Sequence, residues 1–528
     1  MPVRLSPKYW AEHLGMPHHQ TTIRELEMPP EHVDSQDFFA LSTGSRSFTR
    51  YGYADFLCED RPYSVMYRVW PGSHRFLLWG DPISTAAHAR AFRFCGGDGA
   101  ELFEPLSFKG RRGSGIPGGR CAYADSSLEP RWDWGKYLYT YRIWGRLLYN
   151  PEAAPDTWRR HLRKQFPSKA PALEAALASA TRILPILTTA HLPSAANDTY
   201  GPEFYTNQAM MDASRPSPYG DTPSPRVFGN VSPLDPQLFS RINDFAGELL
   251  GGGRAGKYSP IEVAQWLEDL AETAANRLAE AEGQTPGKGD PDFRRMAVDL
   301  KIQIGLGRFF AAKLRSGTLY AIHEHSGDRA ALEEALRLYH RAREIWSQFA
   351  EETKGVYVSD ITFGPLPHMR GHWLDRLPAM DGDIADLAKR LAAVRGAPGQ
   401  SARTRLAIQE ALGRPRRTPV ACLHTPPAQF VPGAPFEVVL SIQEPAESPS
   451  ARLYYRRVNQ AERYQFAEMK PQGRDFRASI PGSYTASKYP LQYYFELRKK
   501  GAEQAWLYPG FAPDLANVPY FVVRPASR

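Results

Sequence analysis

The spacing of apolar residues changes twice along this chain of 528 residues. Short apolar runs separated by turn residues come first, apolar positions three or four residues apart follow from Pro155, and alternation begins after Pro419. Apolar positions three or four residues apart are typical of helices, and alternation is typical of strands. The pattern therefore predicts a multidomain protein with α/β, α and β parts. The expected parts are a partial (β/α) barrel of the TIM type over residues 1–151, an α-helical domain over 152–413, and a β-sandwich of immunoglobulin or fibronectin type over 418–528.

The N-terminal region alternates apolar runs with helix-like segments, an order that predicts βαβ units and a parallel sheet. A complete barrel needs eight such units and about 250 residues, so only about half of one fits here. Three explanations stay open: a half-barrel, a chain that begins midway through a longer protein, and a partner chain or homo-oligomer that completes the ring. The predicted strands are Val3–Trp10, Tyr63–Trp70, Arg75–Asp81 and Ala100–Glu104, and the predicted helices are Ala87–Gly97 and Tyr137–Pro151.

Carboxylates stand at or near the ends of three of these runs. Asp81 precedes Pro82, Glu104 precedes Pro105, and Glu12 follows the first run. The carboxyl ends of parallel strands carry the chemistry of barrels and open sheets. Because glycoside hydrolysis needs two carboxyl groups beside one bond, we expect Glu104 to be the general acid and Asp81 or Glu12 to be the base or nucleophile. The alternative is that each acid caps the helix that follows it.

Candidate sugar contacts are aromatic and basic side chains close to these run ends. Aromatic residues make up 12% of the chain, and flat rings with a polar edge suit sugar surfaces. The glycine-rich loop from Lys109 to Arg120 lacks P-loop spacing, but its arginines could bind a substrate carboxylate, unless it is a solvated surface loop. The expected substrate-binding residues are His13, Arg68, Trp70, Trp79, Arg111, Arg112, Arg120, Trp132, Arg370, His372 and Trp373.

The helical and β parts carry clear boundary signals. Ser259, Pro260 and Glu262 form a capping-box pattern that predicts a helix start. Arg414–Pro419 is expected to be a linker, and the long stretch Pro193–Pro236 is expected to serve a function. Further helices are predicted at Phe293–Arg315, Ala330–Ala350 and Asp383–Val394, and strands at Phe436–Ile442, Ala451–Arg456, Tyr464–Met469, Asp475–Ile480 and Leu491–Arg498.

Charge and composition narrow the function. The net charge of +8 is mild for this length, and no dense basic run with interleaved aromatic residues is present, so nucleic acid is not an expected partner. No apolar run reaches the roughly 20 residues that span a bilayer, so no membrane contact is expected. Without a signal-peptide pattern, we expect the chain as encoded to be cytoplasmic, or periplasmic or secreted if the true N-terminus lies upstream. Four scattered cysteines and the interrupted His368/His372 pair predict neither a metal site nor a cofactor.

One segment resembles a known group of enzymes. Trp144-Gly-Arg-Leu-Leu-Tyr-Asn-Pro151, followed by Asp156-Thr-Trp158, is similar to the end of the catalytic barrel in α-glucuronidases of glycoside hydrolase families 67 and 115. There, a similar Gly-Arg-Leu-x-aromatic-Asn-Pro run leads into a helical domain. The resemblance implies a glycoside hydrolase acting on a glycan that contains uronic acid, and it carries over no catalytic residue. The alternatives are a non-catalytic carbohydrate-binding or assembly protein and an N-terminally truncated fragment of such an enzyme.

Overall fold

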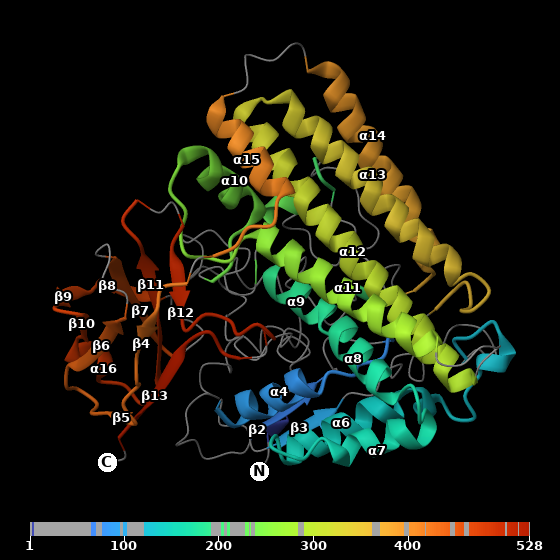
Figure 1. Ribbon diagram of the computed structural model, residues 1–528, viewed down its shortest axis with the longest axis horizontal. Coiled ribbons are helices and arrows are strands. Elements are labelled where there is room, and N and C mark those ends of the chain that lie inside the picture. Colours follow the sequence, from blue (N-terminus) through green and yellow to red (C-terminus); the bar gives the residue numbers. More distant parts are fainter. Residues whose placement is uncertain are drawn as a thin grey trace.

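The computed structural model of the chain describes residues 3–4, 65–69, 76–94, 99–102, 121–191, 202–204, 209–211, 227–231, 233, 238–283, 290–361, 370–394, 401–417, 419–443, 449–458, 464–501, 504–515 and 517–526. A small parallel sheet, a set of long helices and a C-terminal β domain make up these ranges. The β domain lies at one end of the molecule, beside the helices and away from α7 (Figure 1).

The N-terminal sheet is parallel, as the βαβ pattern predicts. Its strands stand in the order β1 (Val3–Arg4), β2 (Val65–Val69) and β3 (Gly99–Leu102). Val69 lies opposite Leu102, so β2 and β3 end at the same edge. Helix α4 (Pro82–Phe94) connects these two strands. Among the described residues the sheet has three strands, and the barrel therefore stays a prediction.

The prediction of a strand at Arg75–Asp81 is wrong, because the described residues of this run form no sheet hydrogen bonds, although the run is buried as expected. Phe76 to Trp79 are all at most 2% exposed, yet they belong to no sheet. Buried backbone groups must be paired, and here side chains replace a neighbouring strand. The amides of Phe76 and Leu77 donate to Glu203, that of Leu78 donates to Asp299, and that of Gly80 donates to Thr181. The carbonyl of Phe76 accepts from Tyr137, that of Leu78 from Gln303, and that of Trp79 from Thr140.

The middle of the chain is helical, as its apolar spacing predicts. Helix α12 lies at the centre, packed against α11 on one side and α13 on the other (Figure 1). The helices are α6 (Leu138–Tyr149), α7 (Asp156–Gln165), α8 (Ala170–Thr181), α9 (Ile183–Ala190), α10 (Ile242–Gly251), α11 (Pro260–Gly283), α12 (Pro291–Ser326), α13 (Arg329–Glu352), α14 (Leu377–Ala393) and α15 (Ala402–Leu412).

Local chemistry fixes where these helices begin and end. The capping box at the start of α11 is confirmed: the Ser259 amide donates to Glu262, 2.8 Å away, and the Glu262 amide donates to the Ser259 hydroxyl, 3.1 Å away. Gly327 ends α12 with a φ of 71°, a conformation that glycine adopts at little cost. Asp328 then caps α13, so a short turn lays α13 back along α12.

One stretch of the described residues is long and apolar enough to cross a membrane by composition. It runs from Ala170 to Ala190 and covers α8 and α9, and 67% of it is buried within the molecule. Leu173, Leu177 and Leu184 are fully buried in the same core as α11 and α12. This burial is what a core helix of the bundle requires.

The C-terminal domain consists of two sheets whose inward residues form one apolar core. Alternation along β6 (Phe436–Ile442) places every second residue in that core, as in other half-buried strands. Three predicted strands match β6, β10 (Asp475–Ile480) and β11 (Leu491–Arg498) to the residue, and β7 (Ser450–Arg457) and β8 (Gln465–Glu468) lie within one residue of prediction. The immunoglobulin or fibronectin type stays a prediction. One sheet has the strand order β4 (Cys422–Leu423), β6, β10 and β9 (Lys470–Gln472). The other has the order β5 (Gln429–Phe430), β13 (Phe521–Pro525), β11, β7 and β8, and β12 (Trp506–Tyr508) also pairs with β11.

The predicted linker Arg414–Pro419 is held tightly to the helices. The Arg417 guanidinium pairs with Glu262, each side chain being 7% exposed, and lies 4.5 Å from the centre of the Tyr258 ring. Because Glu262 also caps α11, one carboxylate both starts a helix and anchors the segment that leads into the β domain. Arg417 also donates to the Ala505 carbonyl of that domain.

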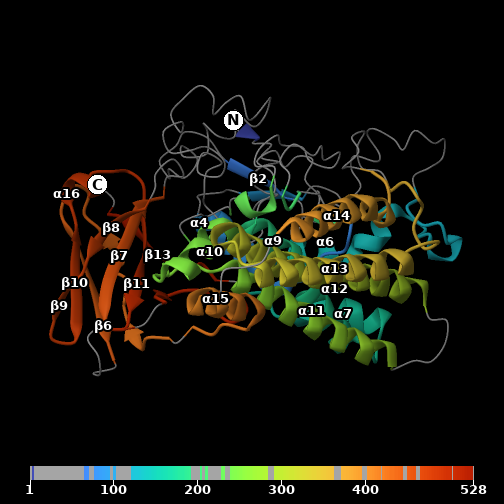
Figure 2. The same ribbon diagram turned by 90° about the horizontal axis from the view of Figure 1, so that it is seen from above.

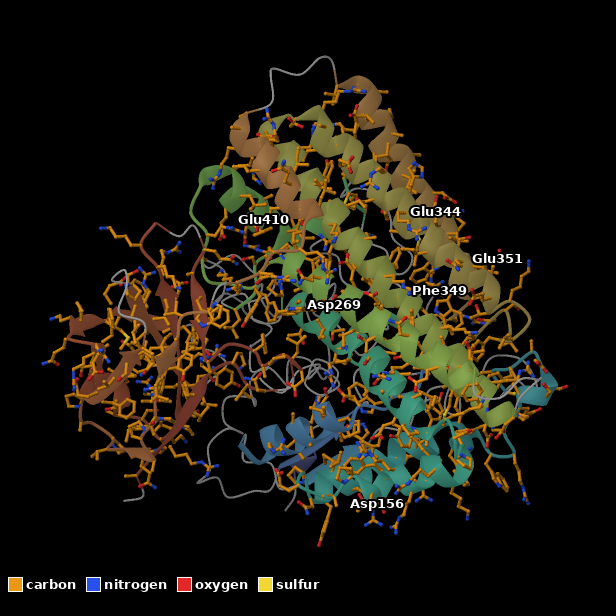
Figure 3. All side chains as sticks on the ribbon, in the orientation of Figure 1. Asp156, Asp269, Glu344, Phe349, Glu351 and Glu410 are labelled. Atoms are coloured by element: carbon orange, nitrogen blue, oxygen red, sulfur yellow. The ribbon has the colours of Figure 1, made fainter. Side chains whose placement is uncertain are left out.

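The close approach of α12 and α13 gives a stability prediction. A Cβ on Gly305 would lie 2.3 Å from Cδ1 of buried Phe349, which Figure 3 labels on α13. We expect Gly305→Ala to lower the free energy of unfolding by about 1–3 kcal/mol in urea titrations, because the methyl group overpacks the contact. The control is Gly247→Ala in α10, where nothing lies within 4 Å. That change should stabilise by about 0.4–1 kcal/mol, and equal effects of the two substitutions would contradict the contact.

Candidate functional site

Asp81 is a helix cap held in a buried ion pair. Its carboxylate is fully buried and accepts two hydrogen bonds from Arg182, at 2.7 and 2.9 Å. The Ser84 hydroxyl and the Ile83 amide, in the first turn of α4, donate to the same carboxylate. All of these partners hold the charged carboxylate in place and leave it no access to a substrate. This geometry supports the capping alternative, and it corrects the expectation that Asp81 acts as base or nucleophile.

The tryptophans predicted to stack on sugar lie in two different environments. Trp79 is 1% exposed, and its indole N–H donates to the Thr85 hydroxyl at 3.0 Å, so its ring belongs to the core. Trp132 is 56% exposed and its neighbour Trp134 is 54% exposed. The Arg131 guanidinium lies 5.9 Å from the centre of the Trp132 ring. Of Trp79 and Trp132, only Trp132 presents a ring that a sugar could reach.

Of Arg370, His372 and Trp373, the last two are buried, whereas the Arg370 side chain is 39% exposed. Arg370 pairs with Asp360, and its pKa is raised mainly by that hydrogen bond. His372 caps the 3-10 helix η9 (Trp373–Arg376), and burial lowers its pKa. Trp373 is fully buried and stacks on Phe204 with the ring centres 5.0 Å apart. The first two therefore organise a turn, and the third belongs to an aromatic core, which corrects the expectation of sugar contact for His372 and Trp373.

The remaining candidates cannot be placed as side chains. Arg68 stands in β2, opposite Glu101 of β3, and only its backbone is described. Glu12, His13, Trp70, Glu104, Arg111, Arg112 and Arg120 lie outside the described residues. In the sequence, Trp70 follows β2 directly, and Glu104 follows β3 by two residues.

A buried lysine, not foreseen from the sequence, stands at the centre of the best-defined polar cluster. The Lys136 ammonium lies 3.0 Å from Asp299 and donates to the Tyr357 hydroxyl at 3.2 Å. It also lies 4.2 Å from the centre of the Phe76 ring and within 5.5 Å of the centres of three tyrosine rings. These rings are Tyr123, Tyr137 and Tyr357. We call Lys136, Asp299 and these four aromatic residues the lysine–aspartate cluster.

The charges of this cluster stabilise one another. Burial is the largest influence and disfavours the ammonium of Lys136, but the charges and hydrogen bonds of Asp299 and Tyr123 together outweigh it and raise the pKa of the lysine. Burial, followed by the charge of Asp299, holds the pKa of Tyr357 well above its usual value, so this hydroxyl stays protonated and donates to the carboxylate. The cluster is thus a closed ion pair at neutral pH, suited to holding structure and not to proton transfer.

The cluster holds the segment Phe76–Gly80, which belongs to no sheet. Asp299 accepts from both Lys136 and the amide of Leu78, so the ion pair and the backbone share one carboxylate. Glu203, also fully buried, accepts from the amides of Phe76 and Leu77. Because this segment leads into α4, these contacts fix the backbone that precedes that helix.

A second buried lysine lies within the helices. Lys313 of α12 is fully buried and 4.0 Å from Asp383, which accepts a hydrogen bond from Tyr339 at 2.6 Å. Burial lowers the pKa of Lys313 to about 8. Burial also lowers the pKa of His191 to about 4, and the nearby Lys313 charge adds to this effect. The His191 ring is tilted against the Phe228 ring, with the ring centres 4.2 Å apart, and its Nε2 donates to the Phe228 carbonyl.

Two hollows open on the helical surface. One of about 720 Å³ lies between α4, α6, α7 and α8, and one of about 490 Å³ lies over α12 between α11 and α13. The first has an apolar floor with Trp158 and Leu162, and its Glu174 is paired with Arg159. In the second, Glu282 is paired with Lys301. Neither presents the free pair of carboxylates that glycoside hydrolysis requires.

Breaking the lysine–aspartate cluster should lower the free energy of unfolding strongly. We expect Lys136→Met to cost about 3–5 kcal/mol in urea unfolding, because Asp299 would remain buried without its counter-charge. Lys354→Met is the control, since its pair with Glu351 is exposed and should contribute less than about 1 kcal/mol. The double variant Lys136→Met/Asp299→Leu should cost less than the sum of its singles. Strictly additive costs would show that the two groups do not interact.

The depressed pKa of His191 predicts acid sensitivity. Between the unfolded value of 6.5 and the folded value of about 4, the unfolded chain binds a proton that the folded chain excludes. The contribution of neutral His191 to the free energy of unfolding is therefore complete above pH 6.5. It is lost as the pH drops toward 4, by on the order of 3 kcal/mol. His191→Gln should remove this part of the pH dependence in unfolding titrations. Exposed His340→Gln is the control, and parallel profiles for His191→Gln and the unmodified chain would refute the assignment.

Comparison with known proteins gives one distant structural neighbour to report. No protein-family model matches the chain. No curated protein matches it either. A solved structure described as a GH138 enzyme that targets the pectin rhamnogalacturonan II is similar over 71% of this chain, with 12% sequence identity and a TM-score of 0.49. The matched part spans about half, 51%, of that structure's length. At this level the likeness is distant, and it specifies neither family 67 nor family 115.

Proposed function

We propose that the chain is a glycoside hydrolase that acts on a polysaccharide or oligosaccharide containing uronic acid. One observation carries the proposal: β2 and β3 are parallel neighbours that end in register, at Val69 and Leu102. In the sequence, an aromatic residue, Trp70, follows β2 directly, and an acid, Glu104, follows β3 by two residues. In sheets of this kind, substrates bind at the carboxyl edge of the strands.

The acid–base pair is assigned to Glu104 and Glu12. Glu104 protonates the leaving oxygen, a role that its apolar neighbours Phe103 and Pro105 favour by disfavouring the charged carboxylate. Asp81 is committed to Arg182, so the second carboxylate is taken from the segment that follows β1, which is also parallel to β2. Glu12 is the first acid after β1 in the sequence, and it serves as the base or nucleophile.

Substrate contacts come from aromatic and basic side chains. Trp70 at the edge and the half-exposed Trp132 supply rings for sugar stacking. Arg111, Arg112 and Arg120, on the loop after Glu104, bind the carboxylate of a uronic acid through bidentate guanidinium contacts. Arg68 of β2 and His13 complete the proposed set.

A non-catalytic carbohydrate-binding or assembly protein is the second candidate. The observation that favours it is the state of Asp81: one of the three acids expected at the edge is bound in a buried ion pair. Such a protein would retain glycans without turning them over. A partner chain or second copy that completes the sheet remains part of either proposal.

Two variants, one studied by kinetics and one by stability, test the assignment. On aryl uronides and uronic-acid oligosaccharides of plant origin, Glu104→Gln should lower kcat by about 10²–10⁴-fold, because a general acid contributes that much. Its melting temperature should stay close to that of the unmodified chain. Asp81→Asn should instead lower stability, because it leaves Arg182 without its buried counter-charge.

Two results would decide against these roles. Equal rates for Glu104→Gln and the unmodified chain would remove Glu104 from the mechanism. Retention of the same oligosaccharides on the immobilised chain, without any product, would replace the hydrolase proposal with the binding protein.

A further inference from the structure

Helices α6 and α7 share a surface whose cations are not neutralised. Arg142 and Arg146 of α6 and Arg160 and Lys164 of α7 are exposed, and their side chains make no ion pair or hydrogen bond within the described ranges. We call these four residues the α6–α7 basic face. None of them takes part in the lysine–aspartate cluster or lies at the sheet edge. Figure 1 shows the two helices side by side at the margin of the molecule.

Cations of the two helices converge on one imidazole. His161 of α7 is partly buried, and its ring lies parallel to that of Tyr139 of α6, 6.5 Å away. Burial lowers its pKa, and the charges of Arg142 and Lys164 lower it further. A residue on each helix therefore acts on the same ring, and α6 and α7 pack against each other, so the four cations stand on neighbouring helices.

The acids of this region are already engaged elsewhere. Asp156, labelled at the outer end of α7 in Figure 3, pairs with Arg163. Glu152 pairs with Arg90 of α4, and Glu174 of α8 pairs with Arg159. The basic face thus keeps its positive charge. On α13 the pattern is different, because Arg337, Arg341 and Arg343 each have a carboxylate partner.

The scaffold below the basic face is rigid. Ile143, Trp144 and Leu147 of α6 are at most 1% exposed, and Trp158 and Leu162 of α7 are at most 4% exposed. These residues belong to the main hydrophobic core or contact it, so the two helices cannot turn their charges away without breaking that core. A rigid array of cations binds a polyanion at a lower entropic cost than a mobile one does.

We propose that the α6–α7 basic face binds an acidic polysaccharide, a chain of uronate residues, outside the catalytic edge. This inference rests on the proposed function, because it assigns a second contact to the same substrate class. Each uronate carries one carboxylate, which matches guanidinium geometry and allows successive sugars to meet successive cations. Binding of this kind raises the local concentration of substrate near the site and weakens as salt rises.

Nucleic acid is the competing polyanion, and the observations favour it less. The chain has a mild net charge and lacks the dense basic array with interleaved aromatic residues that is typical of nucleic-acid proteins. Four cations on two short helices form a small patch. The experiment therefore includes a nucleic-acid arm.

The test is binding of the full chain to polygalacturonate at low salt, measured by calorimetry. The variant Arg142→Glu/Lys164→Glu should weaken binding at least tenfold and flatten its salt dependence. The control Lys389→Glu/Arg405→Glu carries the same charge change on the exposed faces of α14 and α15 and should bind like the unmodified chain. Methyl-esterified polygalacturonate, which lacks the charges, should not distinguish the variants.

The outcomes separate this inference from the proposed function. Equal loss of affinity in both variants would overturn the basic face, because only net charge would then matter. Double-stranded DNA bound more tightly than polygalacturonate, with the same loss in the variant, would assign the face to nucleic acid. Hydrolysis of a small aryl uronide should be unchanged in Arg142→Glu/Lys164→Glu. Absence of such hydrolysis in every protein, with polygalacturonate binding still dependent on the face, would end the hydrolase proposal alone.

Discussion

The ion pair between Lys136 and Asp299 is the interaction on which the junction of sheet and helices depends. A segment of five residues, Phe76–Gly80, runs through the core without a neighbouring strand. Its amides and carbonyls would each cost free energy if they were left unpaired in that environment. Asp299 accepts a hydrogen bond from one of these amides, and it also lies 3.0 Å from the Lys136 ammonium. One buried carboxylate therefore both pairs the backbone and balances the charge of the lysine.

Arginines extend the same principle to the contacts between domains. Arg182 stands at the junction of α8 and α9, pairs with Asp81 at the start of α4, and donates to the carbonyl of Asp514 in the β domain. Arg417 binds Glu262 at the start of α11 and also donates to the β domain. In both cases a helix-capping carboxylate receives the guanidinium. The caps that begin two helices thus also fix how the sheet, the helices and the β domain meet.

The sequence predicted those features that depend on near neighbours. The Ser259–Glu262 capping box spans three residues, and strand β6 follows from alternation within seven. What it missed depends on distant partners: Lys136 and Asp299 are 163 positions apart, and Asp81 and Arg182 are 101 apart. An apolar run such as Phe76–Trp79 signals burial, but it carries no information on whether a strand or a side chain will pair its backbone. The one local signal for Asp81 was Pro82 after it, which suits a helix start as well as a strand end.

The two buried lysines show how short distances decide whether a charge stabilises the fold. Lys136 has a carboxylate oxygen at 3.0 Å and a tyrosine hydroxyl at 3.2 Å, and its pKa rises despite burial. Lys313 has its carboxylate at 4.0 Å, and burial prevails, lowering its pKa to about 8. Coulomb attraction falls with distance while the cost of desolvation stays. A difference of about one ångström therefore decides whether attraction or desolvation sets the pKa of the lysine. The ion pair that holds Phe76–Gly80 therefore has the short distance at which attraction prevails, whereas the groups whose pKa values burial lowers, Lys313 and His191, lie together among the helices. A fall in pH toward 4 therefore bears on the packing of the helices around His191.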